Sequence, residues 1–144
     1  MPTKDEILNM PAGREMDVLI AEKAMGYEWG VAECEMLFFS ERIEKGAPCL
    51  FSPDGSPFVE YYTEDMNAAW LLAESMVEKY KCDIDVGYNA PRKGLNRPPF
   101  FCRIQGGSLE YDNFDCMLVV RAATAPLAIG YVALLAVMEA KDEN

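Results

Sequence analysis

The sequence has no histidine among its 144 residues, which excludes Ser-His-Asp catalysis, Cys-His catalysis and histidine metal ligands. It also lacks the glycine-rich loops G-x-x-x-x-G-K-[ST] and G-x-G-x-x-G, through which many proteins hold phosphate groups. Its five cysteines are odd in number and widely spaced, and no two of them form a C-x-x-C pair. That spacing fits neither a disulfide framework nor a zinc site. The sequence therefore predicts no catalytic residues, no metal site and no cofactor.

Export and membrane signals are missing as well. Residues 1–6 carry no apolar segment of the kind that begins a signal peptide. The most apolar stretch, 125–138, is shorter than the roughly 20 residues that a membrane-spanning helix needs. We therefore expect a cytoplasmic protein, and a reducing cytoplasm agrees with the unpaired cysteines.

Positive charge is scarce, because 13 basic residues stand against 24 acidic ones and give a formal net charge of −11. An acidic surface repels phosphate backbones and anionic membranes. We therefore expect neither non-specific nucleic-acid binding nor membrane binding. Acidic composition is common among cytosolic proteins and does not by itself identify a partner.

Length and composition indicate one globular domain over residues 1–144, with 141–144 as a frayed tail. Three main helices are predicted, the first two from apolar residues that share one helix face and the last from a run that is apolar on nearly every side. These helices lie within 3–26, which also holds a short helical turn around 4–9, and at 63–80 and 124–138. Strands are expected at 82–86, 100–105 and 116–122, and the short turns between them favour antiparallel pairing. This order predicts an α+β fold, in which an antiparallel β-sheet has helices packed on both faces as an α-β-α sandwich.

Residues 30–58 are the part of the chain whose secondary structure the pattern does not settle. Residues 33–44 suit either strands or a short helix. The run Ser52-Pro53-Asp54-Gly55 predicts a β-turn, and strands on either side of it would form a hairpin. Further along, Thr63 occupies the position of an N-cap for the second helix.

Three stretches of the sequence resemble a known family. They are Ile7-Leu8-Asn9-Met10-Pro11-Ala12-Gly13-Arg14-Glu15-Met16-Asp17, continuing to Gly26, then Tyr62-Thr63-Glu64-Asp65-Met66-Asn67-Ala68-Ala69-Trp70, and Ala123-Thr124-Ala125-Pro126-Leu127-Ala128-Ile129 with Ala133-Leu134-Leu135-Ala136. In order and spacing they are similar to the phage alpha-beta-alpha (ABA) sandwich domain, carried by phages and prophages. The chain departs from that family at Gly130-Tyr131, where the family often has a cysteine-arginine pair. The resemblance implies an α-β-α sandwich and a phage protein in the cytoplasm of a bacterial host, and it implies no known reaction.

The segment 88–103 carries the most distinctive candidate site. Four of the 13 basic residues fall within twelve positions of this acidic chain: Arg92, Lys93, Arg97 and Arg103. Guanidinium and ammonium groups bind phosphates and carboxylates, so these side chains are candidate ligands for an anion. Three aromatic residues of the same segment, Tyr88, Phe100 and Phe101, are candidates for stacking on a base. The alternative is a solvated loop whose cations balance nearby carboxylates.

Two pairs of carboxylates suggest a different site. Asp112 and Asp115 lie close together in the sequence, and Asp83 and Asp85 share one face of an expected strand. Such groups could bind a metal ion or exchange protons, although turns and solvated strand faces carry aspartates for solubility as well.

These observations lead to one main hypothesis and two alternatives. The main hypothesis is a phage or prophage accessory protein that acts by binding a host protein or a phage partner, without catalysis. The last helix is apolar on nearly every side, so we expect it to be buried or covered by another subunit, which predicts a homo-oligomer. Alternatively, segment 92–103 sequesters a small anionic molecule of the nucleotide type, or the carboxylates hold the metal ion of an enzyme.

Overall fold

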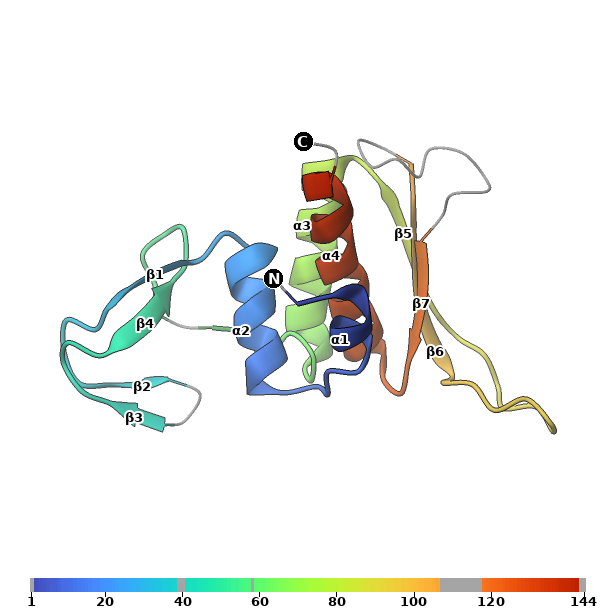
Figure 1. The fold of residues 1–144 in the computed structure, drawn as a ribbon, viewed down its shortest axis with the longest axis horizontal. Helices are drawn as coiled ribbons and strands as arrows, with labels where there is room; N and C mark the ends of the chain where they lie inside the picture. The colour runs from blue at the N-terminus through green and yellow to red at the C-terminus, as the bar shows by residue number, and fades with distance from the viewer. Residues whose placement is uncertain (1, 39–40, 58, 107–117, 143–144) are drawn as a thin grey trace.

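The computed structural model describes residues 2–38, 41–57, 59–106 and 118–142. Its elements in chain order are α1 (Lys4–Leu8), α2 (Arg14–Lys23), β1 (Glu28–Val31), β2 (Met36–Phe38), β3 (Glu41–Ile43), β4 (Pro48–Phe51), α3 (Met66–Tyr80), β5 (Asp83–Tyr88), β6 (Phe100–Gln105), β7 (Leu118–Ala122) and α4 (Ala125–Asp142). Figure 1 shows the helices in the middle of the molecule, with the β5–β6–β7 sheet on one side and the short strands β1–β4 on the other. The predicted α+β class and the antiparallel pairing of strands are confirmed.

Helix α4 is the centre of the core. Every residue from Ala128 to Val137 is buried, because α1, α2, α3 and the sheet all pack around this helix. Thr124 caps its first turn by accepting a hydrogen bond from the backbone N–H of Leu127 at 3.4 Å. The helix runs to Asp142, two residues into the segment expected as a tail. Since the chain itself covers the apolar surface of α4, that surface gives no reason to expect a second subunit.

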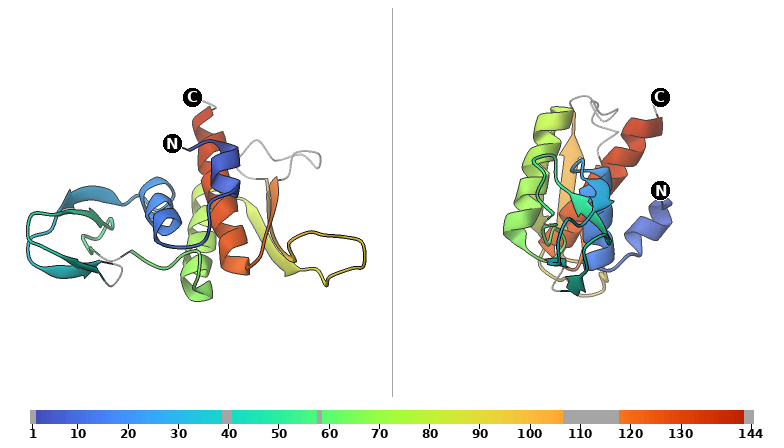
Figure 2. Two further views of the ribbon diagram at one scale, coloured as in Figure 1. Left: turned by 60° about the horizontal axis from the view of Figure 1, so that its bottom comes forward. Right: turned by 90° about the vertical axis from the view of Figure 1, so that its left-hand side faces the viewer.

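The three-stranded sheet β5–β6–β7 has one covered face and one open face. Alternation along the strands turns Cys102, Ile104 and Val120 towards the helices, where they are buried. Asp83 and Asp85 point to the opposite face and are exposed. In the described part of the chain, both helices that contact this sheet, α3 and α4, lie on the same side of it (Figures 1 and 2). The helices therefore do not sandwich the sheet as expected, because α1 and α2 pack on α4 instead.

The structure settles the segment that the sequence left open. Strands β2 and β3 pair as a short antiparallel unit, so the strand alternative for 33–44 is correct and the helix alternative is wrong. The β-turn forms, with the N–H of Gly55 donating to the carbonyl of Ser52 at 2.8 Å. The hairpin around it was a wrong prediction, since β4 pairs with β1. Pro57 follows the turn and has no N–H to donate to a ladder, which disfavours a strand there.

Thr63 does not cap α3, contrary to the prediction. The N-cap is Asp65, whose carboxylate accepts from the N–H of Asn67 at 3.1 Å. Thr63 is buried, and Asp17 of α2 accepts hydrogen bonds from both its backbone N–H and its hydroxyl at 2.8 Å. The Thr63 hydroxyl in turn accepts from the N–H of Gly13 at 2.9 Å. We call Gly13, Asp17 and Thr63 the Asp17 cluster, which ties α2 to the segment before α3.

Candidate functional site

The segment between β5 and β6, residues 89–99, is a loop that projects beyond the sheet. Residues 90–98 are all exposed, and the left view of Figure 2 shows this yellow loop extending away from the helices. At its tip the N–H of Leu95 donates to the carbonyl of Arg92 at 3.1 Å, and Gly94 has a φ of 82°, in the left-handed region that suits glycine. The tip is therefore a closed turn, which presents Lys93 to solvent.

Arg121 of β7 holds the base of this loop. Its Nη2 donates to Oδ1 of Asn89 at 2.8 Å, and its Nη1 donates to the carbonyl of Pro98 at 3.4 Å. The same guanidinium lies over the ring of Phe101, 5.6 Å from its centroid. The N–H of Asn89 also donates to the carbonyl of Pro99 at 2.8 Å. Both ends of the loop are thus fixed to the sheet, while the residues between them remain exposed.

The three predicted stacking residues have different surroundings. Phe101 lies beneath Arg121 and beside Gly87, where a methyl group would come within 2.6 Å of its Cε1. Phe100 packs against Tyr88, with ring centroids 5.0 Å apart. Tyr88 is 56% exposed, so its ring is the one that a ligand could reach. Phe100 and Phe101 already pack against other side chains at the loop base.

The structure brings three of the four predicted cations together. Arg92, Lys93 and Arg97 lie on the exposed loop, and within the described residues none of the three has an ion-pair partner. Arg103 lies inside β6, directly opposite Asp85 of β5, and donates to the carboxylate of Asp85 through Nε at 3.0 Å and through Nη2. Asp85 therefore balances the charge of Arg103, and the unbalanced positive charge belongs to the loop.

Two residues of this surface were missed in the sequence, Arg121 and Leu95. Leu95 is 45% exposed and stands among the three loop cations. The alternation of strand residues 118–122 turns Arg121 to the open face of the sheet, a signal that the sequence does contain. Its contact with Phe101 depends on the pairing of β6 with β7, which no local pattern specifies.

The described part of the chain does not gather its metal-ligating groups into a site. No group of three or more His, Cys, Asp and Glu residues lies there in a position to hold a metal ion. Asp112 and Asp115, candidates for such a role, fall outside the described residues. Burial raises the pKa of the Cys102 thiol to about 12 and also raises the pKa values of Cys49 and Cys82. These thiols are therefore protonated at neutral pH and poor nucleophiles.

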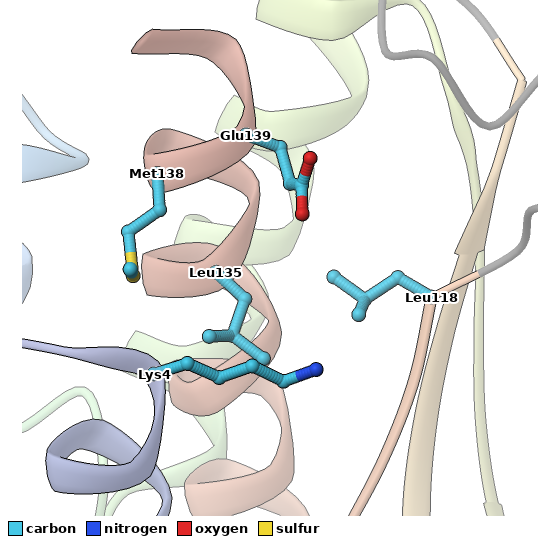
Figure 3. A pocket seen from close by; sticks show the side chains of 5 residues that line it. All are labelled: Lys4, Leu118, Leu135, Met138 and Glu139. Atoms are coloured by element: carbon cyan, nitrogen blue, oxygen red, sulfur yellow. The ribbon is translucent and has the colours of Figure 1, made fainter. Parts of the chain in front are cut away.

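A small hollow of about 200 Å³ lies between α1, α4 and the start of β7. Figure 3 shows its lining: Lys4, Leu118, Leu135, Met138 and Glu139. The ammonium group of Lys4 and the carboxylate of Glu139 approach it from two sides, with Leu118 between them. Because Lys4 and Glu139 carry opposite charges, this hollow has no net positive charge of the kind found on the β5–β6 loop.

Comparison with known proteins gives a likeness of fold. No family model matches the chain, and no curated protein matches it. No helix in the described ranges is both long and apolar enough to cross a membrane. A solved structure, that of a phage protein from Bacillus cereus ATCC 14579, is similar with a TM-score of 0.52 and 20% sequence identity, over 90% of this chain and 93% of that one. The chain therefore shares its overall fold with a phage protein.

Proposed function

We propose that this chain is a phage-encoded accessory protein of the host cytoplasm that binds an acidic surface of another protein through its β5–β6 loop. The observation that carries the proposal is the loop itself, which holds three cations without ion-pair partners in the described residues of a chain with a net charge of −11. Cations concentrated on one projecting element attract and orient an acidic partner, although the rest of the surface is acidic.

The shape of the loop favours a protein partner. Pockets for small molecules are concave and bury most of the ligand, whereas residues 90–98 are exposed on a projection. Arginine is enriched among the residues that dominate protein interfaces, and Leu95 adds an apolar side chain between the cations. Arg121 keeps the loop ends in place before binding, which lowers the entropy lost when a complex forms.

Two likenesses support the phage setting. One is the shared fold with the Bacillus cereus phage protein. The other is the resemblance of the three helical stretches to the phage ABA sandwich family, which we retain as part of the proposal. Phages use small proteins to redirect host factors, so a host protein is the first candidate partner.

Affinity capture with a loop variant tests the proposal. The tagged wild-type chain is expected to retain one host protein in stoichiometric amount, and Arg92→Ala/Lys93→Ala/Arg97→Ala is expected to weaken that binding by about tenfold or more, because several interfacial cations are lost. The control Lys4→Ala/Lys45→Ala/Lys79→Ala removes the same charge from exposed sites elsewhere and should bind as the wild type does. Equal binding by both variants would refute the role of the loop.

A second candidate function rests on the exposed ring of Tyr88 at the base of the loop. A base stacked on Tyr88 would bring its phosphates near the loop cations, so the chain could sequester an anionic nucleotide. Titration with ATP and with inorganic phosphate, followed by native mass spectrometry, distinguishes this function from protein binding. Retention of ATP by the wild type and its loss in Tyr88→Ala would favour the nucleotide.

A further inference from the structure

Helix α3 exposes several large apolar side chains among its polar ones. A surface helix normally turns polar residues to solvent, yet Trp70 is 47% exposed and Leu71 is 51% exposed, and Met66 and Val77 are exposed beside them. Single exposed apolar residues are ordinary on protein surfaces. Here four large ones share the surface of one helix, and tryptophan is the residue most enriched at interface hot spots.

Part of this surface forms a groove between α3 and the start of β5. Its volume is about 220 Å³, and its lining is almost wholly apolar: Trp70, Ala73, Glu74, Val77, Glu78 and Ile84. Glu74 and Glu78 are the acidic residues that line it, and both are exposed. Because the lining surface is almost wholly apolar, their carboxylates lie at the edge of the groove and not inside it. The groove therefore fits an apolar side chain that has positive charges next to it.

The β5–β6 loop of this protein has that chemistry. Leu95 is an exposed apolar side chain at the tip, and Arg92, Lys93 and Arg97 surround it in sequence. We propose that the α3 groove receives the β5–β6 loop of a second copy of this chain, with Leu95 against Trp70 and Val77 and the loop cations beside Glu74 and Glu78. The inference rests on the proposed function, because both use the β5–β6 loop. It further identifies the surface that this loop contacts when no host partner is bound.

The loop cannot reach the groove of its own chain. Strand β5 separates the two, since Ile84 at its start lines the groove and Tyr88 at its end leads into the loop. Four residues of extended chain span about 13 Å, and the loop then continues away from the helices (Figures 1 and 2). Only another molecule can therefore supply the loop.

A reciprocal exchange is the smallest assembly that fills both grooves. If each copy inserts its loop into the groove of the other, a two-fold axis relates them and the dimer is closed. The net charge of −11 on each copy opposes association, but at physiological ionic strength charges are screened beyond about 8 Å. Contacts between the loop cations and the groove carboxylates then outweigh the distant repulsion.

Charge reversal tests this contact with the purified chain alone. Sedimentation velocity at about 100 µM should show the wild type as a dimer. Glu74→Lys/Glu78→Lys and Arg92→Glu/Arg97→Glu should each weaken dimerisation by about tenfold or more, because like charges then face each other. The variant that combines all four reversals restores opposite charges and should dimerise again. Glu28→Lys/Glu44→Lys, which reverses two exposed charges elsewhere, should behave as the wild type does.

Two results would overturn the inference. One is a monomeric wild type at this concentration, and the other is a dimer that Glu74→Lys/Glu78→Lys leaves unchanged. Circular dichroism of each variant verifies that loss of the dimer is not loss of the fold. Glu74→Lys/Glu78→Lys keeps the loop intact and should still capture the host partner. Failure of host capture would therefore count against the proposed function, whereas failure of dimerisation would count against this inference.

Discussion

Thr63→Val is expected to lower the free energy of unfolding by about 2–3 kcal/mol at neutral pH, measured by urea denaturation. Valine keeps the shape of threonine but removes the hydroxyl that donates to Asp17 and accepts from Gly13. The N–H of Gly13 then lacks this partner, and the Asp17 carboxylate keeps only the bond from the backbone N–H of residue 63, in a region where Asp17 and Thr63 are almost fully buried. Because the second carboxylate oxygen of Asp17, Oδ2, already has no hydrogen-bond partner, the loss of the Thr63 hydroxyl leaves this carboxylate with little compensation.

The pH dependence of this loss identifies its cause. Burial raises the pKa of Asp17 above its ordinary value, while the hydrogen bonds from Thr63 lower it. The folded protein therefore binds the Asp17 proton more tightly than the unfolded chain does, and its stability falls as the pH rises through the window between the two pKa values. Thr63→Val raises the folded pKa further, so its destabilisation should be larger at pH 7.5 than near pH 4. Thr63→Ser keeps the hydroxyl and is the control, and an equal loss in Thr63→Ser and Thr63→Val would contradict the account.

Gly87→Ala is expected to loosen the β5–β6 loop without unfolding the protein. A methyl group at Gly87 would lie 2.6 Å from Cε1 of Phe101 and closer still to its Cζ, so the ring has to move. Arg121 lies over that ring and donates a hydrogen bond to Asn89, so movement of the ring displaces the guanidinium and weakens this hydrogen bond. Hydrogen exchange of the Asn89 amide, which donates to the Pro99 carbonyl, should accelerate by about tenfold or more.

A double-mutant cycle verifies this route from Gly87 to the loop. Phe101→Ala removes the ring and should accelerate the same amide by itself. The pair Gly87→Ala/Phe101→Ala should then exchange hardly faster than Phe101→Ala alone, because the added methyl group has no ring left to displace. Full additivity of the two single effects would show that Gly87 acts in some other way.

Local patterns in the sequence predicted the elements better than their arrangement. The helices at Arg14–Lys23 and Met66–Tyr80 follow from apolar periodicity, and the helix at Ala125–Asp142 follows from a nearly continuous apolar run. Both signals are local. The side of the sheet on which each helix packs depends on contacts between distant segments. Pro57 illustrates the difference between local and long-range information. The sequence shows that Pro57 has no N–H and so disfavours a strand after the turn, but it does not show that β4 pairs with β1.

The candidate site was predicted in the same partial way. The cations crowd together in the sequence, so Arg92, Lys93 and Arg97 could be identified without a structure. The pairing of Arg103 with Asp85 could not, because it needs the register of β5 against β6. Thr63 is the clearest case in which a long-range contact overrides a local rule. Its residue type suits an N-cap, but its hydroxyl donates to the carboxylate of Asp17, 46 positions earlier, in the core.

The most direct test of the binding surface is a photo-crosslinking experiment. A photoreactive amino acid takes the position of Leu95 in one variant and of Lys45, an exposed residue of the β3–β4 turn, in another. Each variant is irradiated in host lysate, and the adducts are identified by mass spectrometry. The account predicts that the host protein captured by the wild type is cross-linked from position 95 and not from position 45. A partner cross-linked from position 45 alone would contradict it, because the binding surface would then lie on the opposite side of the molecule (Figure 1).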